Sequence, residues 1–404
     1  MLLPELWKYI FALCSSKDRS VLCQVSNQCN IISLAVSKSL SPLSYDNTIY
    51  DDDELYKSGD YHLIVRLKRQ YDDMYYICQT KDIDVVKLMI SLGANDWDRG
   101  LAGACKGSHI EIVDLMISLG ANNLNGGLAG ACKGGHSEIV KKMIVLGATN
   151  MNLGLKEACI GGHFELAKLI VSMGAIDYNG GLFCACGKGH LELVRLMISL
   201  GANNWNYGLI GACYGGHLKI ISLMISHGAT DWNWGLESAC EGGHIEIINL
   251  MISYGANDWN YGLYGACEGG HLELAEMMIS LGANDWNYGL YNACRGGHIN
   301  TINLMTLHGA NDWNNALEGA CISGNLEIVN LLMTHGANNW NLGLEGSCRG
   351  GHIELAELMI SYGANNWNRN LGTACANGHR RLVKLMISHG AIRCIYCNKS
   401  VDTH

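Results

Sequence analysis

The sequence predicts an all-α protein, a helical solenoid of about twelve stacked helix pairs that follows a small N-terminal helical module. The main observation is a repeat: Gly-Ala pairs recur every 27 residues, from residue 93 to residue 390. Each unit contains two apolar patterns with helical spacing, separated by glycines, which end helices readily. A single helix pair cannot bury its apolar face alone, but stacked neighbours can bury theirs together.

The composition predicts a folded chain. Hydrophobic residues make up 49% and charged residues 16% of the 404 residues, which excludes disorder of the whole chain. The net charge of -9 argues against nucleic acid as a partner. No apolar run is long enough to cross a membrane. Glu5 and Lys8 interrupt the first apolar stretch, so no export signal is expected, and the 18 cysteines are expected in a reducing compartment, the cytoplasm.

Residues 1–45 are predicted to form a separate helical module. A helix opens with proline in its first turn, where the missing N–H does no harm, and a second apolar pattern follows near residue 21. This stretch resembles the F-box, a short module that docks on a Skp1-type adaptor in cullin ubiquitin ligases. The resemblance implies the adaptor-docking residues Leu3, Pro4, Leu6, Ile10, Leu22 and Val25. Arg19-Ser20 and Cys29 depart from the family pattern, and a plain cap on the solenoid is the alternative.

Residues 46–70 are predicted to be a linker and a degenerate capping repeat. Ser58-Gly59-Asp60 stands where other units have Gly-Gly-His, and alternate apolar residues follow it. A polar outer face suits the terminal repeat that a solenoid needs.

Residues 71–392 are predicted to be the repeat array. A typical unit, residues 255–281, reads GANDWNYGLYGACEGGHLELAEMMISL. Its Gly-Leu-x-x-Ala-Cys segment predicts a first helix, and the stretch after His predicts a second helix with one broad apolar face. The Asn-Asp-Trp-Asn segment predicts a turn, because Asn and Asp side chains bond nearby backbone.

The unit resembles the ankyrin repeat. Leu101-x-x-Ala104-Cys105, followed by His109-x-Glu111, carries the resemblance. The period of 27 is shorter than the family's period of about 33, so the projecting β-hairpin finger is expected to shrink to a Trp-bearing turn. Units this short resemble those of ankyrin proteins in large DNA viruses of amoebae, which implies the host-cell cytoplasm as the location.

Residues that recur at fixed positions are interpreted as structural. Twelve cysteines, from Cys78 to Cys375, are expected to fill the core as small apolar side chains. The ankyrin resemblance implies that ten histidines bond neighbouring backbone: His109, His136, His163, His190, His217, His244, His271, His298, His352 and His379. The Asn after each Trp, from Asn206 to Asn368, is expected to form a ladder of bonds, and the tryptophans are expected to act as staples between units.

Three positions vary most between units: the seventh, tenth and fourteenth, counted from the Gly of Gly-Ala. Their spacing of i, i+3 and i+7 puts them on one helical face, which is expected to line a concave groove. Early units carry basic residues there, middle units carry aromatic and acidic residues, and Glu318 and Glu345 follow. Exposed aromatics among charges are typical of an interface hot spot. The predicted partner-binding residues are Tyr207, Tyr214, Trp234, Glu237, Glu241, Tyr261, Tyr264, Glu268, Tyr288, Tyr291 and Arg295.

The predicted function is therefore protein–protein interaction, with a protein target in the groove. The F-box resemblance implies a substrate receptor for a cullin-type ubiquitin ligase. The alternative is a stand-alone ankyrin scaffold or competitor. No Ser-His-Asp, Cys-His or phosphate-loop arrangement stands out, so no enzyme, catalytic residue or cofactor is predicted. In the tail, residues 393–404, Cys394, Cys397 and His404 fall short of the usual four zinc ligands, and no metal site is predicted.

Overall fold

The computed structural model describes residues 74–91 and 94–392, and these residues form helices joined by short turns. The described residues contain 24 helices and no strand, which confirms the predicted all-α architecture of helix pairs. The predicted N-terminal module (1–45), the linker and capping repeat (46–70) and the tail (393–404) lie outside the described residues.

Each repeat contributes a first helix and a second helix. The first helices are α6 (Met74–Gln79), α8 (Trp97–Gly107), α10 (Leu124–Gly134), α12 (Met151–Gly161), α14 (Tyr178–Gly187), α16 (Trp205–Gly215), α18 (Trp232–Glu241), α20 (Trp259–Gly269), α22 (Trp286–Gly296), α24 (Trp313–Ser323), α26 (Trp340–Gly350) and α28 (Trp367–Ala376). The second helices are α7 (Ile83–Ser91), α9 (Ile110–Ser118), α11 (Ser137–Leu146), α13 (Phe164–Ser172), α15 (Leu191–Ser199), α17 (Leu218–Ser226), α19 (Ile245–Ser253), α21 (Leu272–Leu281), α23 (Ile299–Leu307), α25 (Leu326–Thr334), α27 (Ile353–Ser361) and α29 (Arg380–Ser388).

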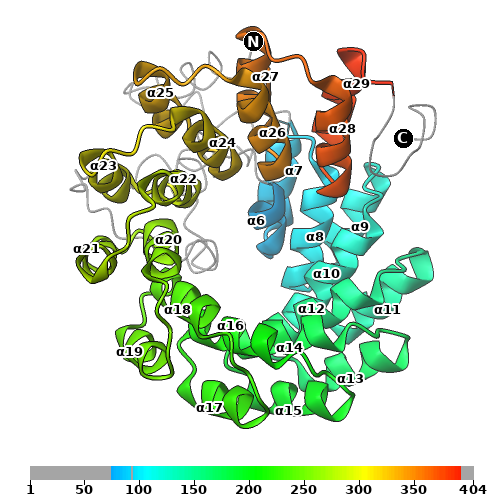
Figure 1. Ribbon diagram of the computed structural model, residues 1–404. Helices are drawn as coiled ribbons and strands as arrows, with labels where there is room; N and C mark the ends of the chain where they lie inside the picture. The colour runs from blue at the N-terminus through cyan, green and yellow to red at the C-terminus, as the bar shows by residue number, and fades with distance from the viewer. Residues whose placement is uncertain (1–73, 92–93, 393–404) are drawn as a thin grey trace, which may run out of the picture. The chain divides into compact units, whose positions relative to one another are not determined.

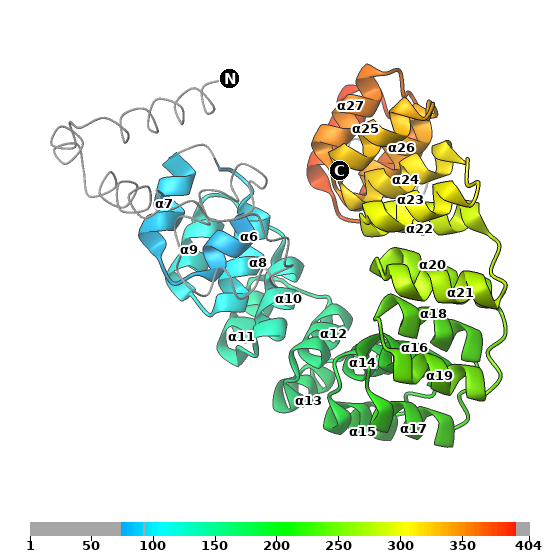
Figure 2. The same cartoon turned by 90° about the vertical axis from the view of Figure 1, so that its left-hand side faces the viewer.

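The helices belong to two compact units, and the boundary between them runs through α14. The first unit continues to Ala185 and includes His190–Ala202, and the second contains Cys186–Gly189 and everything from Asn203 onward. Within each unit the first helices lie together on one side and the second helices on the other (Figure 1). In the second unit, successive pairs such as α16/α17, α18/α19 and α20/α21 form successive layers (Figure 2).

Consecutive first helices touch through their backbones at a recurring glycine. A Cβ added to Gly265 on α20 would lie 2.0 Å from the Glu237 carbonyl oxygen on α18. The same test at Gly103 gives 1.8 Å to the Tyr75 carbonyl oxygen. A side chain at these two positions would collide with backbone, which cannot move aside as a flexible side chain can. At these two contacts the close approach of the first helices therefore depends on glycine, whereas Ser238, Asn292 and Thr373 occupy the same position in other repeats and are buried there.

The recurring cysteines lie in the core between the helices, as predicted. Eleven of the twelve are buried, and Cys375 is half-buried. Burial raises the pKa of the Cys213 thiol to about 12, and burial together with the charge of Glu237 does the same for Cys240. The thiols are therefore protonated at neutral pH and serve as small apolar side chains.

The predicted asparagine ladder is present along the turns. Asn260 Oδ1 accepts hydrogen bonds from the backbone N–H groups of Asn284 (2.8 Å) and Asp285 (3.0 Å), one repeat later. The same paired bonds recur from Asn233 and Asn287, among others. Each asparagine thus fixes the start of the next repeat.

The tryptophans stack on a ring at the end of the second helix of their own repeat. Their role as staples between successive repeats stays a prediction. Trp205 at the start of α16 stacks on His227 just after α17, with ring centroids 4.5 Å apart. Trp232 stacks on Tyr254 in the same way, at 4.9 Å. Because the two helices of a pair run antiparallel, the start of the first lies beside the end of the second, and the indole covers that end.

We expect Gly265→Ala to lower the free energy of unfolding by about 3 kcal/mol, because the new methyl group would collide with the α18 backbone. Urea denaturation followed by circular dichroism measures the change. The matched control is Ser238→Ala, at the equivalent position of α18, where a side chain already fits; it should change stability by less than about 1 kcal/mol. Equal losses in both variants would contradict the proposed backbone contact.

Candidate functional site

Four neighbouring first helices of the second unit, α16, α18, α20 and α22, carry the predicted partner-binding residues. On α18, for example, Trp234, Glu237 and Glu241 follow each other at i, i+3 and i+7, so they share one side of the helix. We refer to the whole set as the aromatic–acidic face: Tyr207, Tyr214, Trp234, Glu237, Glu241, Tyr261, Tyr264, Glu268, Tyr288, Tyr291 and Arg295.

Five aromatic rings of this face, on α18, α20 and α22, touch one another in a continuous row. Trp234 meets Tyr261 edge-on, with ring centroids 5.0 Å apart. Tyr261 lies 6.0 Å from Tyr264, which meets Tyr288 edge-on at 4.5 Å, and Tyr288 stacks on Tyr291 at 5.6 Å. Trp234 is nevertheless 49% exposed and Tyr288 48% exposed. The row therefore holds large rings in fixed positions while leaving parts of them in solvent.

Tyr264 has a structural role as well. Its hydroxyl donates a 2.7 Å hydrogen bond to Oδ2 of Asp285, and the other carboxylate oxygen accepts from the backbone N–H of Tyr288 at the start of α22. Burial, followed by this hydrogen bond, raises the pKa of the Tyr264 hydroxyl above its usual range. Asp285 was not among the predicted site residues; its place directly before Trp286, where Asn or Asp caps helices, was the available signal.

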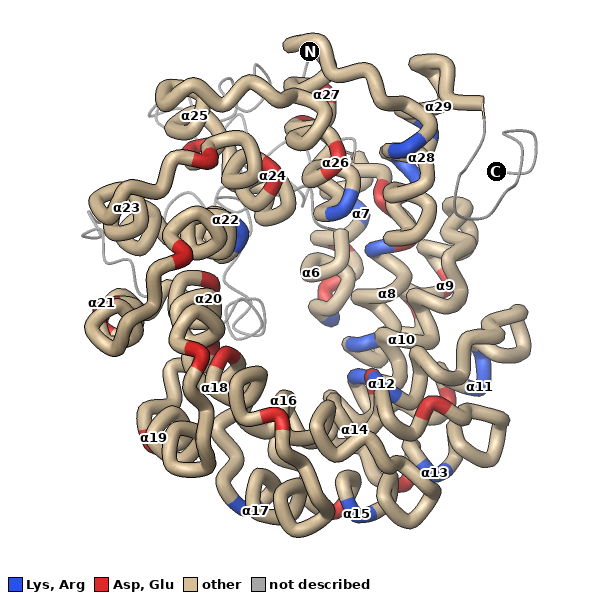
Figure 3. Tube along the Cα trace, in the orientation of Figure 1, with Lys and Arg blue, Asp and Glu red and all other residues tan. Residues whose placement is uncertain are grey.

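Three carboxylates gather beside the rings, with one cation among them. Arg295 Nη1 lies 3.2 Å from Glu268 Oε2. Glu237 and Glu241 have no ion pair within the described residues, and Glu237 Oε2 is shielded from solvent without a hydrogen-bond donor. Acidic positions are visible on α18 and α20, and a basic one on α22 (Figure 3).

This crowding changes the protonation of the carboxyl groups. Burial raises the pKa of Glu237 to about 7, the charges of Glu241 and Glu268 also raise it, and Arg295 opposes them. Burial and the Glu268 charge raise the pKa of Glu241 to about 7. Burial likewise raises the pKa of Glu268, and Arg295 lowers it. A negative charge is therefore costly on this part of the face near neutral pH.

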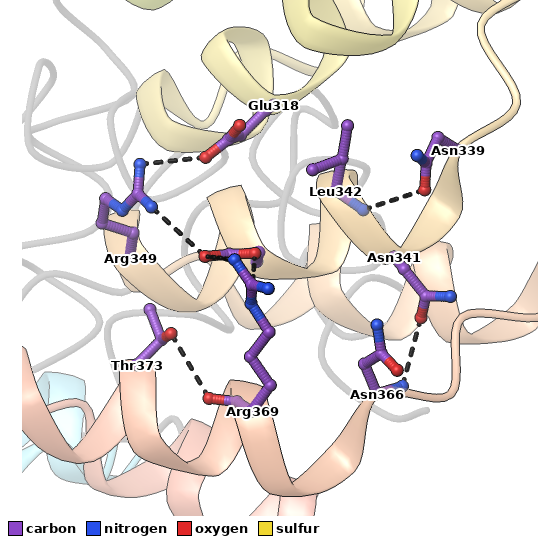
Figure 4. A network of polar contacts seen from close by, with 9 residues as sticks. Glu318, Asn339, Asn341, Leu342, Arg349, Asn366, Arg369 and Thr373 are labelled. Atoms are coloured by element: carbon purple, nitrogen blue, oxygen red, sulfur yellow. Dashed lines mark hydrogen bonds and ion pairs between the residues drawn. The ribbon is translucent and has the colours of Figure 1, made fainter. Parts of the chain in front are cut away.

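Further along the second unit, the acidic residues have their own cations. Arg349 Nη1 lies 2.9 Å from Glu318, and its Nη2 lies 3.4 Å from Glu345. Arg369 Nε lies 2.9 Å from the same Glu345 carboxylate (Figure 4). Glu345 is only 7% exposed, so the expectation that it lines an open surface is wrong: it is held inside a charge network that joins α24, α26 and α28.

In most repeats the main chain at the fourteenth position is bonded by a histidine of the next repeat. His271 Nε2 lies 3.1 Å from the carbonyl oxygen of Glu241, and His379 Nε2 lies 3.1 Å from that of Arg349. Equivalent bonds run from His109, His136, His163, His190, His244 and His352. This confirms the predicted backbone-bonding role for these histidines. Asn325, which replaces one histidine, instead caps its own helix by accepting from the Ile328 N–H.

The basic residues at the same positions in the first unit have partners of their own. Lys156 Nζ lies 2.7 Å from Asp177 Oδ2, and Lys106 Nζ lies 5.6 Å from the centre of the Tyr75 ring. These side chains therefore take part in contacts within the first unit.

The other predicted sites are not described by the structure. The adaptor-docking residues Leu3, Pro4, Leu6, Ile10, Leu22 and Val25 lie outside the described residues, as do Cys394, Cys397 and His404. Within residues 74–91 and 94–392, no cluster of three or more His, Cys, Asp or Glu side chains is arranged to hold a metal ion. Among the helices described, none is both long and apolar enough to cross a membrane.

We expect the double substitution Glu237→Gln with Glu241→Gln to raise the melting temperature at pH 8, and the gain to shrink as the pH falls from 7 towards 4.5. The folded-state pKa values lie above the unfolded value, so these groups favour folding at low pH, and that contribution is lost as the pH rises through about 7. Thermal melts across this range measure the effect. Glu246→Gln, at an exposed position on α19, is the control; a gain that does not depend on pH would contradict the assignment.

Comparison with known families agrees with this architecture. The family described as ankyrin repeats (3 copies) matches residues 182–261 and 263–342. The matched residues include the whole aromatic–acidic face and cover less than half of the chain. No curated protein sequence matches the chain. Residues 182–261 and 263–342 are therefore similar to ankyrin repeats, a family of protein-interaction modules, and the same 27-residue period continues on both sides of them.

Proposed function

We propose that the aromatic–acidic face is the surface with which this protein binds a protein partner. The observation that carries the proposal is the row of contacting rings, which remains partly exposed: Trp234 is 49% exposed and Tyr288 48%. Large aromatic side chains gain most from burial, so rings left in solvent on one face are typical of binding hot spots. Unconstrained surface would instead favour small or charged residues.

Nucleic acid is a poorer fit to the same rings. Single strands do stack on aromatic side chains, but such sites also carry basic residues that follow the phosphate backbone. Glu237, Glu241 and Glu268 lie among these rings, with Arg295 alone beside them. Phosphates would meet uncompensated negative charge, and a polypeptide partner is favoured.

The proposed wider role is that of a substrate receptor for a cullin-type ubiquitin ligase in the cytoplasm. Its support is the resemblance of residues 1–45 to an F-box. In this role the face holds the target and the N-terminal module holds a Skp1-type adaptor, so that other subunits modify a target brought into proximity. The alternative is a stand-alone scaffold or competitor in which residues 1–45 only cap the solenoid.

We expect Trp234→Ala with Tyr288→Ala to reduce the retention of partner proteins by immobilised full chain at least about tenfold, because both substitutions remove exposed hot-spot rings. Quantitative mass spectrometry of the retained proteins measures the loss. Val145→Ala with Leu307→Ala is the matched control, since both side chains are apolar and more than 80% exposed but lie on second helices. Equal retention by the two double variants would contradict the proposed surface.

We expect the full chain to bind purified Skp1-type adaptor, and Ile10→Asp with Leu22→Asp to abolish that binding, because charges would replace apolar docking side chains. Pull-down with purified components measures it. The variant Trp234→Ala with Tyr288→Ala should retain the adaptor. If the folded full chain captures no adaptor, the ligase role is wrong and the capping alternative stands.

A further inference from the structure

We propose that the partner docks a basic segment on the aromatic–acidic face, with an arginine side chain paired to the carboxylates of Glu237, Glu241 and Glu268 and lying against Trp234. This inference rests on the proposed function and adds the chemical class of the partner. It is argued from the charges of this face, from a comparison with the neighbouring repeats and from the chemistry of its rings.

The carboxylates of Glu237, Glu241 and Glu268 outnumber the cations beside them. Three carboxylates share one guanidinium, that of Arg295, whose ion pair is with Glu268. Oxygen Oε2 of Glu237 is hidden from solvent and accepts no hydrogen bond from any donor. Among the described residues, no further basic side chain pairs with Glu237 or Glu241.

The second step is a comparison within the same unit. On α24 and α26, Glu318 and Glu345 occupy the same position of the repeat as Glu237, the tenth. Both are neutralised from within the chain, by Arg349 and Arg369 (Figure 4). The fold can therefore place a guanidinium beside an acid at this position. At Glu237 and Glu241 it does not, and the complementary cation is left for a partner to supply.

The third step concerns which cation fits. The described residues contain no carboxylate cluster arranged to hold a metal ion, which favours an organic cation. Trp234 lies one helical turn from Glu237 on α18 and is half exposed. A guanidinium is planar, pairs with carboxylates through two parallel hydrogen bonds and stacks on aromatic faces, so it suits both neighbours at once. An ammonium group would use the carboxylates but stack less well.

The test measures binding of a defined probe to the full chain. The probe is a fluorescein-labelled octapeptide of alternating Arg and Gly, compared with the Lys-Gly and Glu-Gly octapeptides by fluorescence anisotropy at low salt. We expect Arg-Gly to bind more tightly than Lys-Gly, and Glu-Gly not to bind. Glu237→Gln with Glu241→Gln should weaken Arg-Gly binding at least about tenfold, and Trp234→Ala should remove the preference for arginine over lysine.

The matched control is Glu246→Gln with Glu273→Gln, which makes the same change in net charge at exposed positions on α19 and α21. If both double glutamine variants weaken Arg-Gly binding to a similar extent, the peptide is attracted only by the overall charge of -9, and the inference is overturned. Equal affinity for the Arg-Gly and Glu-Gly peptides would overturn it as well. A further outcome is that the variant Glu237→Gln with Glu241→Gln retains natural partners but the variant Trp234→Ala with Tyr288→Ala does not. That result would support the proposed binding surface and would overturn the inference that the partner docks a basic segment.

Discussion

The rest of the structure depends on the close approach of neighbouring first helices. At Gly265 the backbone of one helix lies against the carbonyl oxygen of Glu237 on the helix before it, with no room for a methyl group. Helices in contact at this distance cannot slide along each other without a collision, so equivalent residues of successive repeats stay in line. The variable residues of separate helices therefore form rows, and residues 27 positions apart in sequence meet as neighbours in space.

Much of the fold could be predicted from the sequence because the same residue types recur at the same positions of many repeats. A cysteine that recurs twelve times beside leucine and alanine indicates a small buried position. The ankyrin resemblance implies a backbone bond for the histidine after paired glycines, and the asparagine after tryptophan indicates another; the structure shows both. The helix pairs follow from apolar spacing alone. All of these features depend on relations that are the same in every unit.

The contacts that the sequence did not predict depend on geometry between helices. Trp205 finds its partner 22 residues later, because the second helix returns to the start of the first. Glu345 looks exposed by its place in the repeat, yet Arg349 and Arg369 enclose it. Tyr264 looks like a free surface ring, yet Asp285 of the next repeat holds its hydroxyl. Each depends on which individual residues stand on adjacent repeats, and the repeat pattern does not contain that information.

The histidine bonds have a consequence for how such a protein can acquire new partners. Each histidine bonds only the main-chain carbonyl of the residue at the fourteenth position and does not use its side chain, so lysine, tyrosine, glutamate, isoleucine and arginine all occur there on the same scaffold. Each of these bonds spans 30 residues, so loss or duplication of one 27-residue repeat that carries the histidine still leaves a histidine opposite the carbonyl of the preceding repeat. The order of side chains along the face can thus change by loss, duplication or exchange of whole repeats, while the contacts between neighbouring repeats stay the same.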